Sequence, residues 1–292
     1  KILQEKIFDN IWIQPAAGDA GGSLGAALAL WYLEFNNERI VNPEDDMQGS
    51  YLGPNFDQNK IEKELELIGA NFEIVDYDNL INRTTDYLSK EKAIGWFQGR
   101  MEFGPRALGA RSILGDPRSE TMQKNLNLKV KFRESFRPFA PSILREDLSK
   151  WFNMEVDSPY MLLVTDINDE KKIEMNEDQK KLFGIDKLNI KRSEIPAITH
   201  VDYSARIQTV SKKTNKPYYD LLNKFKEKTG CPVLVNTSFN VRGEPIVNTP
   251  TDAFNCFMGT ELDYLIIGNC ILDKNKQNPK LKKNYTKEFE LD

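Results

Sequence analysis

Polar side chains gather in one short stretch of the sequence, NTSFNVRGEPIV, residues 236–247. Its amide, hydroxyl and guanidinium groups are carried by Asn236, Thr237, Ser238, Asn240 and Arg242. A planar guanidinium donates two parallel hydrogen bonds to an anion, and amides and hydroxyls add neutral donors and acceptors around it. Such a set can bind a phosphate, a sugar hydroxyl or a small planar amide. We therefore interpret residues 236–247 as a binding loop.

A second segment with binding chemistry is GRMEFGPRALGARSILGDPR, residues 99–118, which carries four arginines among four glycines. Arginine on a glycine-rich turn suits phosphate or carboxylate recognition, because the backbone can approach the ligand closely. The alternative is a solvated surface loop. Phe103 and Leu108 favour a segment anchored on the core, so Arg106 and Arg111 are candidate anion-binding residues.

A third basic segment, NLKVKFRESFRPFAP, residues 127–141, contains a Lys-x-Arg pair, Lys131 and Arg133. On a strand these two residues would share one face with Lys129, whereas on a helix the three would spread apart and form an ordinary solvated face. Pro138 ends any helix here. The pair is therefore predicted to lie at the end of an element, where it can point at a ligand.

Two single residues follow in HVDYSARIQTV, residues 200–210. Arg206 is either a further cation of the site or an ordinary charge on a strand edge. His200 is the one histidine of the chain, so a His-rich zinc site, or a Ser/His or Cys/His nucleophile pair, would depend on it. Nothing in the sequence places a nucleophile beside His200, and a structural role is favoured.

Composition narrows the class of protein. A net charge of −4 over 292 residues excludes the chain-wide basic field that drives nucleic-acid binding. No apolar stretch approaches the roughly 20 residues of a membrane span, and the longest, SLGAALALWYLEF, is expected to be a packed helix. The three separated cysteines, Cys231, Cys256 and Cys270, predict buried thiols in a reducing cytoplasm and not a disulfide framework.

The elements that must position these groups alternate between strands and helices, which predicts an α/β fold with a mixed sheet. Strands are expected at residues 11–14, 71–77, 93–99, 160–167, 205–210, 231–236 and 262–272, with a further apolar segment at 139–145. Helices are expected at residues 26–35, 59–70, 78–91, 119–132, 216–230 and 249–260. Thr249 or Thr251 is expected to cap the last helix.

Polar segments that contain turn-forming residues separate these elements. A linker or domain boundary is expected within residues 38–57, a solvated excursion at 168–193, and a frayed polar tail over the last twenty residues. The glycine-rich turn at 15–25 favours helix–strand packing and ligand binding about equally. The chain has no initiator methionine and begins within the segment KILQEKIFDNIWIQPAAGDAGG, so we expect it to be the C-terminal part of a longer protein.

Five motifs in this order resemble the carbamoyltransferases of nodulation-factor and antibiotic biosynthesis, the NodU/CmcH family. They are QPAAGDAGGSLGAAL, MEFGPRALGARSIL, VKFRESFRPFAPSIL, ITHVDYSARIQTV and NTSFNVRGEPIV, and the likeness spans most of residues 11–272. TSFNVRGEP and KFR are also similar to the Ser-x-Asn and Lys-x-Arg stretches of threonylcarbamoyl-adenylate synthases.

The resemblance implies a two-domain enzyme. An N-terminal ASKHA-type domain would transfer the carbamoyl group, and a C-terminal YrdC-like domain would make carbamoyl adenylate from carbamoyl phosphate and ATP. It implies a YrdC-like twisted mixed sheet with flanking helices, preceded by a terminal fragment of the ASKHA-type domain. Residues 1–40 would be that fragment, 41–57 a linker, 58–273 the YrdC-like domain and 274–292 a polar tail.

The resemblance also implies roles for individual residues. Lys131, Arg206 and Arg242 would be catalytic cations that, with Arg133, hold carbamoyl phosphate and the ATP phosphates. Ser238 and Asn240 would orient phosphates or Mg²⁺, Asn236 would line the same site, and Arg106 and Arg111 would make second-tier phosphate contacts. Asp19 matches a family aspartate that helps bind Fe²⁺. The partner histidines four residues apart are missing here, so the transfer half-reaction is expected to be lost.

Other functions stay open at this point. One is a nucleotide- or RNA-binding YrdC-like module without turnover, and another is threonylcarbamoyl-adenylate synthesis from threonine and bicarbonate. The expected partners are carbamoyl phosphate, ATP and the missing N-terminal domain, with no nucleic acid and no membrane. The acceptor would be a hydroxyl of a sugar or natural product, and a homodimer is compatible with the sequence.

Overall fold

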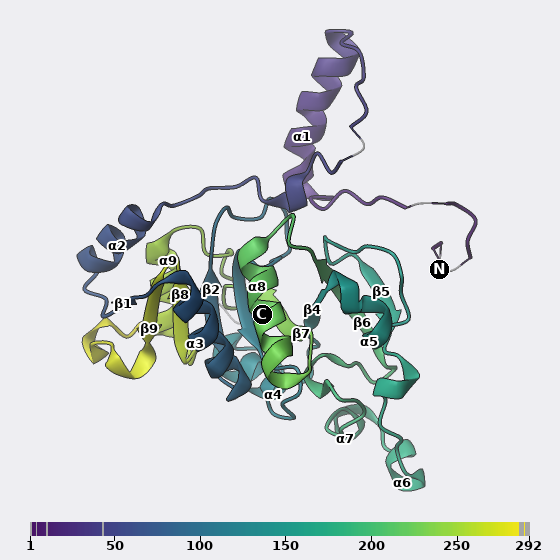
Figure 1. The fold of residues 1–292 in the computed structure, drawn as a ribbon, viewed down its shortest axis with the longest axis vertical. Helices are drawn as coiled ribbons and strands as arrows, with labels where there is room; N and C mark the ends of the chain where they lie inside the picture. Colours follow the sequence, from purple (N-terminus) through teal and green to yellow (C-terminus); the bar gives the residue numbers. More distant parts are fainter. Residues whose placement is uncertain (1, 4, 10, 43, 286–288, 290–292) are drawn as a thin grey trace.

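The computed structural model describes residues 2–3, 5–9, 11–42, 44–285 and 289, and its centre is one nine-stranded sheet (Figure 1). The strands run in the order β1-β9-β8-β2-β3-β7-β4-β6-β5. Their bounds are β1 Glu73–Ile74, β2 Ile94–Phe97, β3 Arg111–Gly115, β4 Ala140–Leu144, β5 Leu163–Asp166, β6 Ser204–Val210, β7 Val233–Ser238, β8 Tyr264–Ile267 and β9 Cys270–Asp273. Two neighbouring pairs are parallel, β2 with β8 and β4 with β6, and the other pairs are antiparallel. The predicted α/β class with a mixed sheet is confirmed.

Strand β3 is the element that the sequence did not predict. All five of its residues are buried, and it pairs antiparallel with β2 on one side and β7 on the other. Its sequence, RSILG, begins with a charged arginine and ends with a glycine, and such a composition is more typical of a loop than of a buried strand. The pairing of β3 with β7 brings Ser112 opposite Ser238 and so places the arginine-rich segment beside the predicted binding loop.

Helices flank the sheet. They are α2 Gln58–Leu67, α3 Tyr77–Ser89, α4 Met122–Asn125, continued by the π-helical turn η3 Leu126–Val130, α5 Leu148–Trp151, α8 Lys216–Thr229 and α9 Pro250–Gly259. Helices α3 and α8 pack on each other, as do α2 and α9 (Figure 1). The predicted cap of α9 is Thr249, which accepts a hydrogen bond from Asp252 N–H while the Asp252 side chain accepts one from Thr249 N–H.

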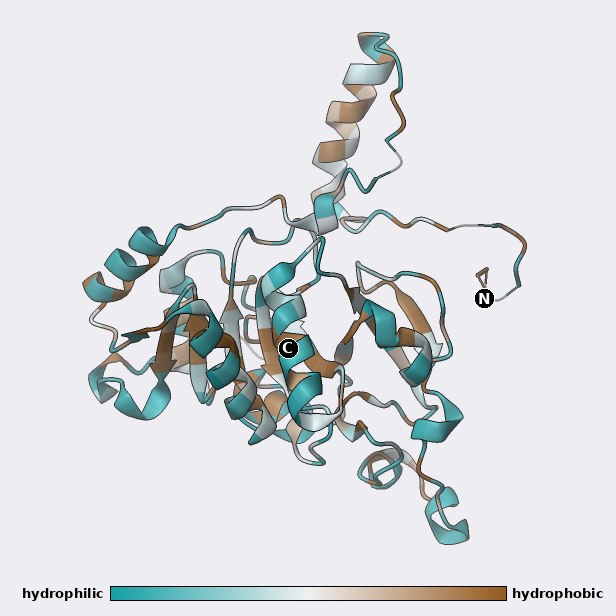
Figure 2. Cartoon of the chain, in the orientation of Figure 1, coloured by the Kyte–Doolittle hydropathy of each residue, from teal (hydrophilic) through white to brown (hydrophobic). Residues whose placement is uncertain are grey.

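An N-terminal arm projects from the body of the molecule (Figure 1). It contains α1 Asp19–Ala29 and the π-helical turn η1 Leu30–Glu34, neither of which has a buried residue. The helix expected at 26–35 is confirmed, but its expected packing is wrong within the described chain. Figure 2 shows hydrophobic residues along this arm. Trp31 and Leu33 of the arm are 52% and 74% exposed. The strand expected at 11–14 is also wrong, because these residues have no strand partner.

The C-terminal end is more ordered than expected. The single strand predicted at 262–272 is a hairpin, β8 and β9, that turns at Gly268 with φ +50°. The expectation of a frayed tail is wrong as far as Tyr285, whose ring is buried against Gly259. The rest of that tail, at 286–288 and 290–292, lies outside the described residues. All three cysteines are free and buried, as predicted.

The excursion at 168–193 is only partly solvated. It contains α6 Glu177–Lys180 and α7 Gly184–Leu188, and Phe183 is 92% exposed. Arg192, however, is buried: it donates to the carbonyls of Lys187, Leu188 and Ile190 at one end and of Thr199 at the other. This guanidinium ties α7 to the chain that leads into β6.

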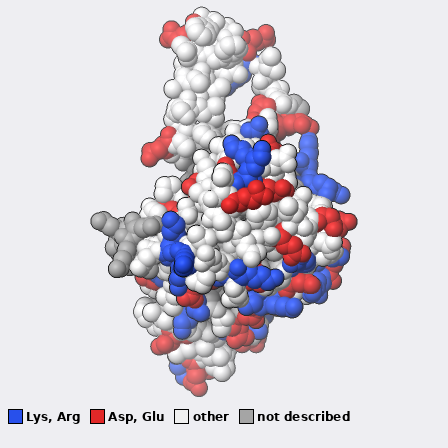
Figure 3. Space-filling model, turned by 90° about the vertical axis from the view of Figure 1, so that its left-hand side faces the viewer, with Lys and Arg blue, Asp and Glu red and all other residues white. Residues whose placement is uncertain are grey.

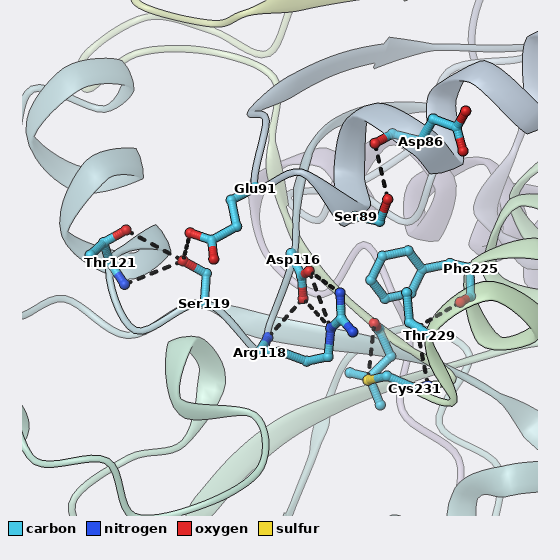
Figure 4. A network of polar contacts seen from close by, with 11 residues as sticks. Asp86, Ser89, Glu91, Asp116, Arg118, Ser119, Thr121, Phe225, Thr229 and Cys231 are labelled. Carbon is cyan, nitrogen blue, oxygen red and sulfur yellow. Dashed lines mark hydrogen bonds and ion pairs between the residues drawn. The ribbon is translucent and has the colours of Figure 1, made fainter.

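The turn after β3 contacts the chain that follows this excursion and leads into β6 (Figure 4). Arg118 is paired with the buried Asp116 at 2.6 Å, and its guanidinium lies 5.3 Å from the centre of the Phe225 ring. Ser119 donates to Glu91 at 2.6 Å. The carbonyl of Pro117 in this turn accepts a hydrogen bond from Ala197 N–H. This contact holds the short helix η6, Pro196–Ile198, against the turn.

Two surface properties complete the description. In the part of the chain that the structure describes, no helix combines the length and apolar character needed to cross a bilayer. On the face drawn in Figure 3, basic and acidic side chains are interspersed over the body, and the projecting arm is largely uncharged. This face therefore carries no single basic field.

Candidate functional site

Lys131 is the centre of the first group of predicted site residues. It follows the last residue of η3, so the prediction that the Lys-x-Arg pair lies at the end of an element is confirmed. Its side chain is 3% exposed, and Nζ donates to Ser238 Oγ at 3.2 Å and to the carbonyl and Oδ1 of Asn240, each at 2.8 Å. The carbonyl of Ser238 is a fourth acceptor. Four uncharged oxygens at the end of β7 therefore surround one ammonium.

Burial controls the protonation of this lysine. Loss of solvent lowers the pKa of Lys131 to about 7, and the nearby charge of Arg133 acts in the same direction. Cys256 and Glu244 oppose the shift. Lys131 can therefore gain or lose its proton close to neutral pH.

The loop after β7 is built to hold this arrangement. Phe239 anchors it in the core under Gly95, where any Cβ would lie 2.5 Å from the Phe239 ring. Gly243, with φ +77°, allows the left-handed turn that follows. Arg242 N–H donates to the carbonyl of Lys131 at 3.2 Å, so the two predicted motifs are joined through their backbones as well.

Further cations surround Lys131. We call Lys131, Arg133, Arg137 and Arg242 the lysine group. Arg133 donates to Asn127 Oδ1 at 2.6 Å, and burial, followed by the charge of Arg137, lowers the pKa of Arg133 to about 10. Glu134 lies 2.9 Å from Arg137 and 3.7 Å from Arg242. Glu134 thus stands among the three arginines of the group, whose positive charges outnumber it and favour an anion.

Arg106 and Arg206 form a second cluster, which we call the arginine pair. Both side chains are partly buried, and each Nε is buried without a hydrogen-bond partner among the described residues. Burial lowers the pKa of Arg206, and the charge of Arg106 lowers it further. Two like charges with unsatisfied donors are costly unless an anion joins them. The geometry therefore suits a phosphate or carboxylate.

Asn236 connects this pair to the sheet. It is 1% exposed, and its Nδ2 lies 3.1 Å from the carbonyl of Ala107, 3.0 Å from Ser142 Oγ and 2.8 Å from Gln208 Oε1. Strand β4 lies between β7 and β6, with Ala140 opposite Asn236 of β7 and Ser142 opposite Gln208 of β6. Asn236 therefore holds the loop that carries Arg106 against the strand that carries Arg206.

Arg111 belongs to neither cluster. It is fully buried, its ring-facing guanidinium lies 3.5 Å from the centre of Phe97, and its donors reach the carbonyls of Gln98, Gly99, Ala110 and Pro54. Burial lowers the pKa of Arg111 to about 10. The terminal nitrogens of Arg111 are used by the backbone and brace the 98–111 turn, while its Nε, like those of Arg106 and Arg206, has no partner among the described residues. The expected phosphate contact of Arg111 stays a prediction.

Asp19 lies at the first residue of α1, exposed on the projecting arm. Among the described residues there is no group of three or more His, Cys, Asp or Glu side chains placed to hold a metal ion. The residues present therefore do not fit the expected iron site, and no chemical step is assigned to iron in this chain.

A cavity of about 420 Å³ has none of the residues of the two clusters in its lining. Its lining is mostly apolar and consists of Gln123, Phe136, Pro138, Gly184, Ile185, Leu188, Ala197, Ile198, Thr199, His200 and Val201. Two lining residues, Phe136 and Pro138, flank Arg137 of the lysine group in the sequence. Burial lowers the pKa of His200, which also lines the cavity, and the charge of Arg206 contributes to that decrease. A flat apolar ligand with an anionic end would fit this combination.

Sequence reasoning missed parts of this arrangement. The cavity is assembled from four separate segments, so no single motif signals it. His200 was expected to be structural, yet it lines the cavity. Glu244 is one of the polar residues of the predicted binding loop but was given no role, although its spacing of four residues from Asn240 across a glycine is typical of a turn closed by a side chain.

Known proteins resemble this chain over most of its length. A family model described as the carbamoyltransferase C-terminus matches residues 85–274. An uncharacterized protein of Synechocystis sp. is 54% identical over 295 residues, covering all of this chain and 48% of that protein. Nodulation protein NolO of Bradyrhizobium diazoefficiens is 40% identical, covering 94% of this chain and 46% of its own length. The 3'-hydroxymethylcephem-O-carbamoyltransferase of Streptomyces clavuligerus is 30% identical, covering 90% and 43%.

The chain thus spans about half the length, or less, of these curated relatives. Among solved structures, full-length HypF in its phosphate- and nucleotide-bound form matches with a TM-score of 0.37 and 16% identity, covering 63% of this chain and 20% of that one. A likeness this distant carries no argument about the site.

Proposed function

The chain belongs to the carbamoyltransferase family, and from this membership we propose that it binds carbamoyl phosphate and ATP and makes carbamoyl adenylate. The carbamoyl group would then pass, in the full-length protein, to a hydroxyl of a sugar or natural product. The observation that carries the proposal is the contact of buried Lys131 with Ser238 and Asn240. It joins the Lys-x-Arg and Ser-x-Asn motifs in one site.

The reaction that this site would support has two steps. Water splits carbamoyl phosphate into carbamate and phosphate, a carbamate oxygen attacks the α-phosphorus of ATP, and pyrophosphate leaves. Two polyanions repel each other, so fixed cations that face the reacting phosphates lower the barrier. Lys131, Arg133 and Arg242 would serve one end of the reactants, and the arginine pair the other.

In this proposal, the cavity binds the apolar part of ATP. About 420 Å³ lies within the usual size of a ligand pocket, and the aromatic and aliphatic walls suit the adenine ring of ATP. Gln123, Thr199 and His200 are the polar groups available to its edge. Mg²⁺ would enter with the ATP phosphates, and no protein ligand is assigned to it.

The proposed domain limits accord with the fold. All nine strands lie within 58–273, the proposed YrdC-like domain, and the exposed helix α1 lies within 1–40, the proposed remnant of an ASKHA-type domain, joined by the linker 41–57. The exposed apolar face of α1 fits a segment that packs against the remainder of a longer protein. The family match does not favour the RNA-binding or threonylcarbamoyl alternatives.

Pyrophosphate release from ATP tests the proposal. We expect release that requires carbamoyl phosphate and that is lost in Arg242→Ala but retained in Arg100→Ala, which removes an exposed arginine of the neighbouring loop. Release without carbamoyl phosphate, or release driven instead by threonine and bicarbonate, would overturn it. Salt-dependent RNA binding without any adenylate would do so as well.

A further inference from the structure

Glu244 is a half-buried carboxylate beside the lysine group that none of the predicted roles includes. Its Oε2 accepts a hydrogen bond from Val241 N–H at 2.8 Å, and its backbone carbonyl accepts one from Asn240 Nδ2 at 2.6 Å. Its own N–H donates to the carbonyl of Val241 at 3.3 Å. Glu244 therefore closes the turn from both its side chain and its backbone.

That turn presents the groups that hold Lys131. Asn240 offers Nζ both its carbonyl and its Oδ1, while its Nδ2 is fixed by Glu244. The Glu244 carboxylate acts on Asn240 indirectly: by holding Val241 N–H it positions the Glu244 carbonyl that accepts from Asn240 Nδ2, while Ser238 Oγ donates to Asn240 Oδ1 at 2.6 Å. The orientation of Lys131 thus depends on a residue that does not touch it in any of these hydrogen bonds.

Charge makes the same connection. The oxygens around Lys131 Nζ are all uncharged, and Arg133 adds a repulsive cation. The Glu244 carboxylate acts in the opposite direction and raises the pKa of Lys131. An ammonium buried among neutral dipoles needs such a counter-charge to stay protonated at neutral pH.

The neighbours of Glu244 come from four elements. Burial raises the pKa of Glu244, and hydrogen bonds from Val241 on its own loop, Tyr285 of the C-terminal segment and Cys256 of α9 oppose that rise, as does the charge of Lys131. Lys274, after β9, acts on Cys256 from the far side, and burial lowers the pKa of Lys274 to about 8. Glu244 is therefore the carboxylate of a buried polar cluster with two lysines and a thiol.

We propose that Glu244 is a positioning residue for this site: its carboxylate fixes the turn from Asn240 to Arg242 and supplies the negative charge that keeps Lys131 an ammonium for phosphate binding. The statement about phosphate rests on the proposed function. The statement about Lys131 does not, because it concerns two groups of the protein alone.

Glu244→Gln separates charge from shape. Glutamine keeps an oxygen that can accept from Val241 N–H, so the turn is preserved while the charge is lost. The matched control is Glu261→Gln, which removes an exposed carboxylate 3.6 Å from Lys129, two residues away from Lys131. Titration of the chain labelled with ¹³C at lysine Cε, with Lys131→Met as the assignment reference, gives the pKa of Lys131 without any substrate.

We expect Glu244→Gln to lower the pKa of Lys131 by roughly one unit and Glu261→Gln to leave it unchanged. The dissociation constant for ATP should then rise about fivefold at pH 7, because fewer molecules carry the ammonium, and return to the wild-type value at pH 5.5. An unchanged Lys131 pKa, or a loss of affinity that is equal at both pH values, would overturn the proposal.

A measurement on the unaltered protein covers the case in which Glu244→Gln does not fold. The amide proton of Val241 should shift as the Glu244 carboxyl titrates, since the two are hydrogen bonded. Absence of that shift would contradict the proposed turn. If ATP fails to bind while both titrations behave as expected, the proposed function fails and the positioning of Lys131 by Glu244 stands.

Discussion

The lysine group and the arginine pair both concentrate positive charge, but they do so in opposite ways. Lys131 is buried and surrounded by four oxygens of Ser238 and Asn240. Arg106 and Arg206 are only partly buried, and each has a buried Nε without a partner among the described residues. Lys131 has its acceptors within the protein, whereas each arginine of the pair has a donor left for a ligand.

This difference separates stability from binding. A satisfied buried cation contributes to the fold through the acceptors it occupies, and removing it leaves those acceptors without a donor. An unsatisfied pair of like charges costs stability in the empty protein and is compensated when an anion arrives. The two clusters should therefore respond to substitution with different combinations of lost activity and lost stability.

The largest effect is expected from Lys131→Met. Adenylate formation should fall roughly a hundredfold, about 3 kcal/mol of transition-state stabilisation, and the free energy of unfolding should fall by about 1–3 kcal/mol because carbonyls at the end of β7 lose their donor. Pyrophosphate release and urea denaturation measure the two quantities. Lys129→Met, which removes an exposed lysine, should change neither; an unchanged stability in Lys131→Met would erase the contrast between the clusters.

Arg206→Ala should have the next largest effect, and on activity alone. We expect about a tenfold loss of adenylate formation, since a partly exposed cation contributes less than a buried one. The free energy of unfolding should stay the same or increase, because repulsion from Arg106 is relieved. Denaturant titration of Arg206→Ala beside wild type decides this, and a clear destabilisation would mean that the pair is structural.

A smaller effect is expected from pH, with opposite signs for binding and stability. Phosphate affinity should fall as pH rises through about 7, where Lys131 loses its proton. Between that pH and the ordinary lysine pKa of 10.5, the unfolded chain holds a proton that the folded chain lacks. Stability from this group should therefore rise with pH in that window.

Calorimetry makes the pH prediction quantitative. Binding of ATP near pH 7.5 should take up protons, which appears as a dependence of the measured heat on the ionisation enthalpy of the buffer. Lys131→Met should abolish most of this uptake. Binding without proton uptake in the wild type would show that Lys131 is already charged at that pH.

The smallest effect is expected from Asp19→Asn on the projecting arm. Asp19 is exposed and joins no metal-binding group among the described residues. Adenylate formation and the free energy of unfolding should both stay within about 0.5 kcal/mol of wild type. A loss of adenylate formation in this variant would place the arm at the site and extend the comparison to a third region.

Much of this arrangement follows from local sequence. Pro138 limits the preceding helix, so Lys131 had to lie near an element end, and Thr249 with Asp252 spells a capping box. The alternation of apolar strands with amphipathic helices gave the fold class. These features depend on neighbours within a few residues, which is why the sequence reveals them.

The rest depends on contacts between distant segments. RSILG resembles a loop because Arg111 is charged, yet burial of this arginine is offset by three carbonyls and an aromatic ring from distant residues and by the carbonyl of the adjacent Ala110. Helix α1 has the composition of a packed helix, but none of its residues is buried in the described chain, and Leu24 packs only partly against the smaller core cluster. Whether Arg106 meets Arg206 is decided by strand order, which local patterns do not encode.

The central claim is that the lysine group and the arginine pair act on the same bound reactants. A crystal structure of the chain with a non-hydrolysable ATP analogue and carbamoyl phosphate tests it most directly. We predict phosphate oxygens within hydrogen-bond distance of Arg133 or Lys131 at one end and of Arg106 or Arg206 at the other, with the base in the cavity beside His200. Reactants bound at only one cluster, or at neither, would contradict the account.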